Sequence, residues 1–151
     1  TNRSSLESEI SLYIDYLNER INKKGDSLLI KPHPGNLEIK KKLLIKKLKA
    51  ENFTILNNQF EKDQITKLPL KIIPLELLCT ILVKKIKINE KDIKIALNSN
   101  ATLSTSYLFP KIKCLEPFGE KLIYKYIKKE FAKKRIVQEE ILAKKIYINK
   151  K

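Results

Sequence analysis

The 151-residue sequence predicts a single α/β domain in which a parallel β-sheet is flanked by helices. Short apolar runs of strand length alternate with longer segments whose apolar residues recur every three or four positions. Hydrophobic residues make up 42% of the chain and charged residues 32%, a composition typical of a folded protein with its own core. We therefore expect one domain over residues 1–151, with the element order of half a doubly wound fold.

The first half of the chain predicts two helices and two strands. Apolar residues from Leu6 to Ile21 follow helical spacing, Gly25 marks the end of that helix, and Asp26 and Ser27 lead into a strand. The predicted elements are a helix over residues 5–23, a strand over 28–31, a helix over 37–50, a strand over 53–56 and a turn at 57–58.

The second half predicts further strands alternating with helices. Pro74 fits the first turn of a helix, because its fixed φ suits that position and its missing N–H is not needed there. The predicted elements are a strand at 72–73, a helix from 74 to about 83, a strand over 92–97, a polar loop over 99–106, a strand over 111–115 and helices over 120–133 and 137–145.

The formal net charge of +15 favours an anionic partner. Only Arg3, Arg20 and Arg135 are arginines, whereas base readout and bidentate phosphate binding favour arginine over lysine. We expect most lysines to be solvated, and some to attract a nucleotide, an anionic glycan or an anionic membrane surface. A basic nucleic-acid-binding module stays open as an alternative.

The two cysteines lie in apolar runs, and we expect Cys79 and Cys114 to be buried free thiols in a reducing, cytoplasmic setting. One histidine and two separated cysteines do not give the spacing of a zinc site, so no metal is expected. The sequence contains no apolar run long enough for a membrane span, no signal peptide at its start and no glycine-rich dinucleotide or P-loop motif.

The most informative segment surrounds the single histidine, in the stretch LLIKPHPG at residues 28–35. Pro32 and Pro34 end the strand, and each holds the residue before it extended, which fixes the direction of Lys31 and His33. Ligands bind at the carboxyl ends of strands in open α/β sheets. A histidine beside a lysine can bind a phosphate and stabilise its departure as a leaving group. The alternative is an ordinary polar loop histidine.

Two later segments follow predicted strands in the same way. Glu76, in the first turn of a predicted helix, can accept hydrogen bonds from a ribose diol, or can simply favour the helix dipole. Ser104, Thr105 and Ser106 end a polar stretch that begins at Asn98; their hydroxyl groups can bind a phosphate near a helix start, or can cap the next segment.

Together these segments resemble bacterial sialyltransferases of the GT-B architecture, namely the lipooligosaccharide sialyltransferases (glycosyltransferase family 52) and the capsular polysialyltransferases. Those families share a His-Pro motif after a strand, an Ile-Pro-x-Glu-Leu segment in many members and a later Ser-Ser or Ser-Thr motif. The corresponding residues here are His33-Pro34, Ile73-Pro74-Leu75-Glu76-Leu77 and Ser104-Thr105-Ser106. The resemblance covers about residues 26–117 and implies a Rossmann-like fold, the C-terminal, donor-binding half of a GT-B glycosyltransferase.

The resemblance implies a role for each of these residues. His33 would be catalytic, contacting the phosphate of CMP-sialic acid and assisting the loss of CMP, while Lys31 and Pro34 would help to hold the nucleotide. Glu76 would bind the ribose hydroxyls. Ser104 and Thr105, or Thr105 and Ser106, would bind the phosphate. The reaction would need no metal and no cofactor, and would transfer sialic acid with inversion to a bacterial surface glycan.

The sequence departs from the family pattern at the general base. The family uses an acid in an Asp/Glu-Asp/Glu-Gly motif of its N-terminal acceptor domain, and none of the three glycines here follows an acid. We therefore expect a donor-binding domain without its acceptor-binding partner, with weak or no transferase activity by itself. Such a domain would lie in the cytoplasm or against the inner face of the inner membrane, and could self-associate through the uncovered face. Another GT-B donor, CMP-Kdo or a UDP-sugar, stays open as an alternative.

Overall fold

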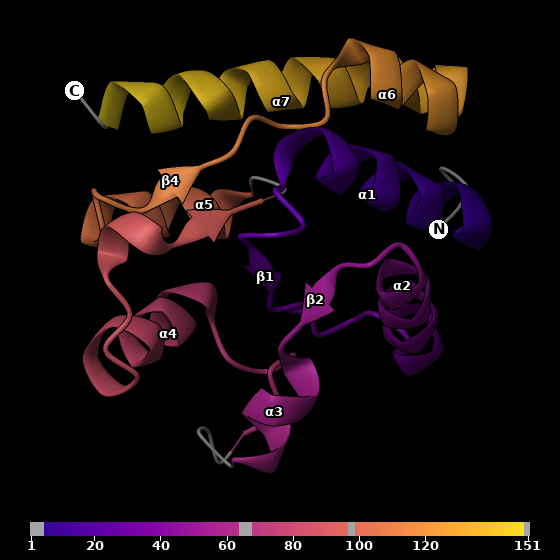
Figure 1. Cartoon of the computed structure of the whole chain (residues 1–151). Helices are drawn as coiled ribbons and strands as arrows, with labels where there is room; N and C mark the ends of the chain where they lie inside the picture. Colours follow the sequence, from indigo (N-terminus) through magenta and orange to yellow (C-terminus); the bar gives the residue numbers. More distant parts are fainter. Residues whose placement is uncertain (1–4, 64–67, 97–98, 150–151) are drawn as a thin grey trace. The chain divides into compact units, whose positions relative to one another are not determined.

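The computed structural model describes residues 5–63, 68–96 and 99–149, and Figure 1 shows their mixed α/β, mostly helical structure. The chain divides into two compact units, each described here by itself. The N-terminal unit is Leu6–Ile73, and the C-terminal unit is Pro74–Lys151 together with Thr1–Ser5. Among the described residues each unit contains one two-stranded parallel sheet.

The N-terminal unit is built around a β-α-β segment. Strands β1 (Ser27–Leu28) and β2 (Thr54–Ile55) pair in parallel, with Ser27 opposite Thr54 and Leu28 opposite Ile55. A parallel pair needs a crossover connection, and helix α2 (Glu38–Ala50) supplies it and packs against β2. Helix α1 (Leu6–Arg20) packs against α2, and helix α3 (Asn57–Lys62) follows β2 directly.

The C-terminal unit repeats the same arrangement. Strands β3 (Lys94–Ile95) and β4 (Lys113–Cys114) pair in parallel, and helix α5 (Asn100–Leu108) lies between them in the sequence as the crossover. The helices before them are α4 (Leu75–Thr80), which continues into a π-helical turn (η1, Ile81–Lys85), and a 3₁₀ turn (η2, Glu90–Asp92). Helices α6 (Glu120–Tyr126) and α7 (Lys129–Asn149) complete the unit. Helix α5 packs against both α4 and α7.

A buried apolar cluster joins the strands of this unit to their helices; it consists of Cys79, Ile95, Phe109 and Ile112. Both cysteines are free, as expected, but only Cys79 is fully buried, whereas Cys114 is half-buried. Burial raises the pKa of the Cys79 thiol to about 11, and the nearby Glu76 and Cys114 add to the shift. Cys79 is therefore an inert core residue at neutral pH.

Several sequence predictions are confirmed. The helices expected over 5–23 and 37–50 form as α1 and α2, and the helix begun by Pro74 runs through α4 and its π turn. The strands expected over 28–31, 53–56, 92–97 and 111–115 are present only as two-residue pairs, although Leu97 lies outside the described residues. The continuous parallel sheet of a Rossmann-like GT-B half is therefore not confirmed.

Other expectations about local structure are wrong. Residues 72–73 form a turn rather than a strand, because their N–H groups bond back within the chain, Ile72 N–H to Pro69 O and Ile73 N–H to Leu70 O. Asn57 begins helix α3 rather than a turn, and Ser99 caps helix α5, so the expected polar loop is helical. The last helix begins at Lys129, because extended backbone at Ile127 ends α6 earlier than the apolar pattern indicates.

One ion pair joins the two long helices of the N-terminal unit. Lys40 on α2 and Tyr13 on α1 both donate to the Glu9 carboxylate, and the two charged side chains are mostly buried. Burial alone would raise the pKa of Glu9, but the hydrogen bonds from Lys40 and Tyr13 outweigh it, so the pKa lies below its ordinary value. The ionised carboxylate therefore stabilises the contact between α1 and α2.

A carboxyl group with a lowered pKa stabilises the folded state above its ordinary pKa of 4.5, and this contribution is lost as the pH falls through the folded-state value. We expect Glu9→Gln to lower stability at pH 6 by up to about 1 kcal/mol, and to make it fall less between pH 6 and pH 3.5. Urea unfolding at both pH values measures the effect. Glu7→Gln is the matched control, because Glu7 is an exposed acid on the same helix. Equal pH dependence in Glu9→Gln and the wild type would contradict this assignment.

Candidate functional site

The predicted His-Pro loop leaves the parallel pair of the N-terminal unit at its carboxyl end. Beyond the last β1–β2 pair, Leu56 N–H still donates to Leu28 O at 2.8 Å, so the chain stays extended toward Ile30. Pro32 is buried, whereas His33 and Pro34 are exposed. The loop is thus anchored at its base and presents its imidazole to solvent, as the two prolines predict.

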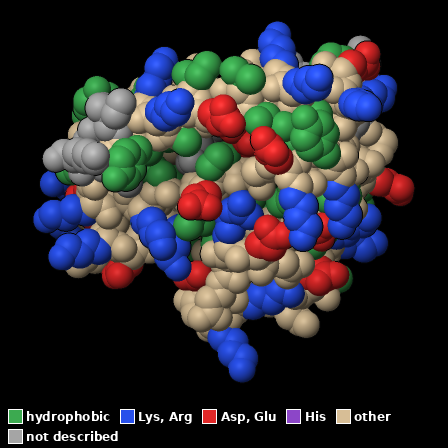
Figure 2. All heavy atoms as spheres, turned by 90° about the horizontal axis from the view of Figure 1, so that it is seen from above, with side chains coloured by type: hydrophobic (Ala, Val, Ile, Leu, Met, Phe, Trp, Pro, Cys, Tyr) green, Lys and Arg blue, Asp and Glu red, His purple; other side chains and the backbone are tan. Residues whose placement is uncertain are grey.

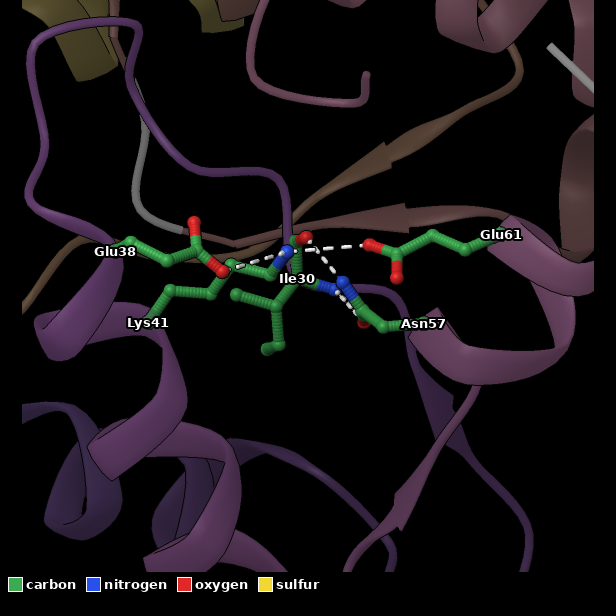
Figure 3. Close-up of polar contacts among 5 residues, drawn as sticks. All are labelled: Ile30, Glu38, Lys41, Asn57 and Glu61. Carbon is green, nitrogen blue, oxygen red and sulfur yellow. Dashed lines mark hydrogen bonds and ion pairs between the residues drawn. The ribbon is translucent and has the colours of Figure 1, made fainter.

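Asn57 secures the base of this loop. Its carboxamide oxygen accepts a hydrogen bond from Ile30 N–H at 2.8 Å, and its amide nitrogen donates to Ile30 O at 2.7 Å (Figure 3). Asn57 is 1% exposed, so both polar atoms of its side chain are buried and paired. The sequence predicts a turn at this residue and not this role, because Asn57 and Ile30 are 27 positions apart and only the β-α-β crossover brings them together.

His33 is held in one tautomer by the loop itself. Gly35 N–H donates to His33 Nδ1 at 3.1 Å, and Asn36 N–H donates to His33 O at 2.9 Å. A neutral imidazole that accepts at Nδ1 carries its proton on Nε2. The free edge of the ring is therefore an N–H donor, which is the group that can bind a phosphate oxygen.

Lysines near the loop differ in their availability. The Lys31 ammonium is half-buried and donates to Pro32 O at 3.4 Å, so it stays within the loop. Lys41 on α2 is engaged by Glu61 of α3 at 3.1 Å and by Glu38 at 3.7 Å, and Figure 3 shows its ammonium between the two carboxylates. Lys41 thus ties α2 to α3, whereas Lys31 belongs to the loop itself and lies two residues before His33.

The other predicted site residues belong to the C-terminal unit. Glu76 lies in the first turn of α4, as expected, and its carboxylate is near enough to the Cys79 thiol to help raise that pKa. Glu76 is half-buried.

The three hydroxyl residues lie within helix α5 rather than in a loop before it. Thr105 donates to Ala101 O at 2.8 Å and Ser106 donates to Leu103 O at 2.7 Å, and both are buried. Ser104 is exposed. Such back-bonding satisfies small hydroxyl groups inside a helix, which explains how this polar stretch forms one.

The N-cap of α5, Ser99, lies five residues before Ser104, where the predicted motif begins. Ser99 is the N-cap, and a capping box joins it to Thr102, whose hydroxyl accepts from Ser99 N–H at 3.0 Å. Asn98 lies outside the described residues. The first-turn N–H groups of α5 therefore belong to Asn100, Ala101 and Thr102, and that of Thr102 is bonded by the Ser99 side chain in the capping box. The Ser-x-x-Thr spacing, a variant of the capping box, is the signal for this helix start.

The structure thus brings the predicted residues together in two sets. Lys31, His33 and Pro34 share one loop of the N-terminal unit, and Glu76 and Ser104–Ser106 lie on helices α4 and α5, which pack together in the C-terminal unit. In the described part of the chain, no three His, Cys, Asp or Glu side chains are grouped to hold a metal ion. Over the same residues no helix is both long and apolar enough to cross a membrane.

Comparison with known families gives one match. The family model of alpha-2,8-polysialyltransferases matches residues 2–65. This range contains α1, β1, α2, β2 and α3, with the His33 loop and Asn57, and ends before Glu76 and α5. The expected resemblance over residues 26–117 is therefore supported only in its first part. No curated protein and no solved structure matches the chain. The family match supports a sialyltransferase role for the protein.

The hydrogen bond from Gly35 predicts a measurable tautomer of His33. Because the chain has one histidine, its two imidazole nitrogens can be observed by long-range ¹H–¹⁵N correlation without ambiguity. In the neutral ring we expect protonated Nε2 and unprotonated Nδ1, with Gly35→Pro shifting the ring toward a tautomer mixture because the N–H donor is gone. Gly35→Ala is the control: it keeps the N–H, and its Cβ would meet His33 Nδ1 at an ordinary 3.5 Å. A ring protonated on Nδ1 would contradict the assignment.

Proposed function

We propose that the chain binds CMP-sialic acid as the donor-binding part of a sialyltransferase that acts on a bacterial surface glycan. The observation that carries this proposal is the His33 loop: its outward Nε2–H donor and its lysine lie within the residues that match alpha-2,8-polysialyltransferases. A neutral N–H donor and an ammonium on a stiff loop suit a phosphodiester, which presents oxygens and one negative charge.

The proposed chemistry uses His33 on the leaving group. In sialyl transfer the bond between the anomeric carbon and a phosphate oxygen breaks, and both of its electrons go to CMP. A hydrogen bond from His33 Nε2–H to a phosphate oxygen strengthens as that charge develops, and the Lys31 ammonium adds to the stabilisation. The acceptor hydroxyl attacks the opposite face and loses its proton to a base. Because the acidic motif of the family is not in this sequence, we propose donor binding here, with transfer weak or absent in this chain alone.

The family resemblance assigns further nucleotide contacts to residues of the C-terminal unit. Glu76, at the start of α4, would accept hydrogen bonds from the ribose hydroxyls. Ser104, Thr105 and Ser106 are the residues that the family resemblance assigns to the phosphate. The buried, back-bonded hydroxyls of Thr105 and Ser106 favour moving that contact to the start of α5, where Ser99 and free N–H groups lie.

The electrostatics favour a small anionic ligand over a nucleic acid. On the face drawn in Figure 2, lysine and arginine side chains lie among acidic and apolar ones. Several cations are also used inside the protein, as Lys40 and Lys41 are. Nucleic-acid binding would need a row of free cations along the backbone path.

Titration with CMP tests the proposal directly. We expect CMP at millimolar concentration or below to shift the imidazole resonances of His33. His33→Ala and Lys31→Ala should each weaken CMP binding by about tenfold or more, because each removes a charge-assisted contact to phosphate. Asn36→Ala and Lys42→Ala are the matched controls, since both residues are exposed, one in the same loop and one on α2. Their affinity should stay within about twofold of the wild type.

The nucleotide preference separates the alternatives. A bound nucleotide raises the melting temperature by mass action, so CMP should stabilise the protein more than UDP or GDP at equal concentration. A larger rise in melting temperature with UDP than with CMP would indicate that the donor is a UDP-sugar rather than CMP-sialic acid. Micromolar binding of DNA or RNA at physiological salt with no response to CMP would overturn the proposal in favour of a nucleic-acid-binding module.

A further inference from the structure

We infer that Asn57 is a positioning residue for the His33 loop: its side chain takes the place of a backbone peptide and holds Ile30, so that Lys31 and His33 are presented in one geometry. Its effect on nucleotide binding rests on the function proposed above. The geometric claim itself concerns only contacts within the N-terminal unit.

The hydrogen-bond pattern of the parallel pair shows why such a residue is needed. In a parallel ladder, the chain that donates at one position accepts at the next, so after Leu56 N–H donates to Leu28 O the next bond should run from Ile30 N–H to Leu56 O. That carbonyl is turned into α3 instead, because Leu56 has helical backbone angles (φ −94°, ψ −5°) and its oxygen accepts from Phe60 N–H at 3.0 Å. The turn of β2 into α3 therefore leaves both polar groups of Ile30 without a strand partner.

Asn57 fills this position with the right chemistry. A carboxamide has the acceptor and the donor of a peptide group, and here the oxygen accepts from Ile30 N–H while the nitrogen donates to Ile30 O. A buried backbone N–H or C=O group without a hydrogen-bond partner lowers the stability of the folded state. The two bonds from Asn57 therefore decide whether the backbone at Ile30 can stay in place beyond the end of β1. An aspartate would keep the acceptor but place a carboxylate oxygen against the carbonyl. An apolar side chain of similar size would keep neither bond.

The link from Ile30 to the imidazole is short and stiff. Lys31 follows Ile30 directly, Pro32 is buried, and the two prolines restrict the backbone between Ile30 and His33. The bond from Gly35 then fixes the ring. Since few torsions between Asn57 and His33 are soft, a change at Asn57 should reach the direction of the Nε2–H bond without any contact between Asn57 and the ligand.

The wild-type protein already provides one test. Asn57 and Asn58 are neighbours on α3, but the first is buried and paired while the second is exposed. We expect the side-chain amide protons of Asn57 to exchange with solvent at least about a hundredfold more slowly than those of Asn58, and the Ile30 amide to be as protected as that of Leu56. Equal exchange of the two carboxamides, measured by NMR, would overturn the inference whatever happens to any variant.

Substitution tests the consequence for the loop. Asn57→Asp and Asn57→Leu should broaden or split the His33 and Gly35 resonances and weaken CMP binding by about tenfold, whereas Asn58→Asp and Asn58→Leu should change neither. Phe60→Leu controls for general destabilisation, because Phe60 is buried on the same helix. Its melting temperature should fall, but its loop resonances and CMP affinity should stay those of the wild type.

The two proposals fail in different ways. If wild-type protein does not respond to CMP, the proposed donor binding is wrong, but the amide exchange and the His33 line shapes still decide the role of Asn57. If wild type and both Asn57 variants bind CMP equally, with unchanged His33 spectra, Asn57 is not a positioning residue. If Phe60→Leu disturbs the loop as strongly as Asn57→Asp does, Asn57 contributes only to general stability.

Discussion

The geometry of the N-terminal unit depends on how the backbone at Ile30 is satisfied. A two-residue parallel pair is short, and β2 turns into α3 immediately after it, so the first strand has no neighbour where the His33 loop begins. The side chain of Asn57 extends the pairing by one peptide-like unit. The half-buried Lys31 and the exposed imidazole of His33 both follow a stretch of backbone that this single carboxamide keeps in place.

Several of the basic side chains that make up the large positive charge have individual partners within the protein. Lys40 and Lys41 neutralise carboxylates that tie helices together, and Arg20 and Lys23 lie over the rings of Tyr16 and Phe53, at 4.3 and 4.7 Å from the ring centroids. These cations contribute to packing as well as to charge. What distinguishes Lys31 is its place in a proline-bounded loop beside a histidine, and a net charge alone does not reveal this.

The sequence predicts the helices better than the sheets. Long amphipathic segments such as α1 and α2 are specified by spacing within one stretch of chain, and both form close to the expected bounds. The length of a strand depends on a partner that is distant in the sequence. The apolar runs around Leu28 and Ile95 therefore predict strands, but they do not predict that each strand pairs over only two residues. The same limit hides Asn57, whose partner lies across a crossover. The sequence does predict the His33 loop, because prolines restrict the backbone of their immediate neighbours.

The two cysteines differ in a way that has a practical consequence. Because burial raises its pKa to about 11, the Cys79 thiol stays protonated at pH 7, and it is also shielded by its neighbours in the core. Cys114 is less enclosed and lies on β4, paired with Ile95 of the strand that precedes α5. A maleimide fluorophore added to the native protein should thus attach at Cys114 in preference to Cys79, without an engineered cysteine.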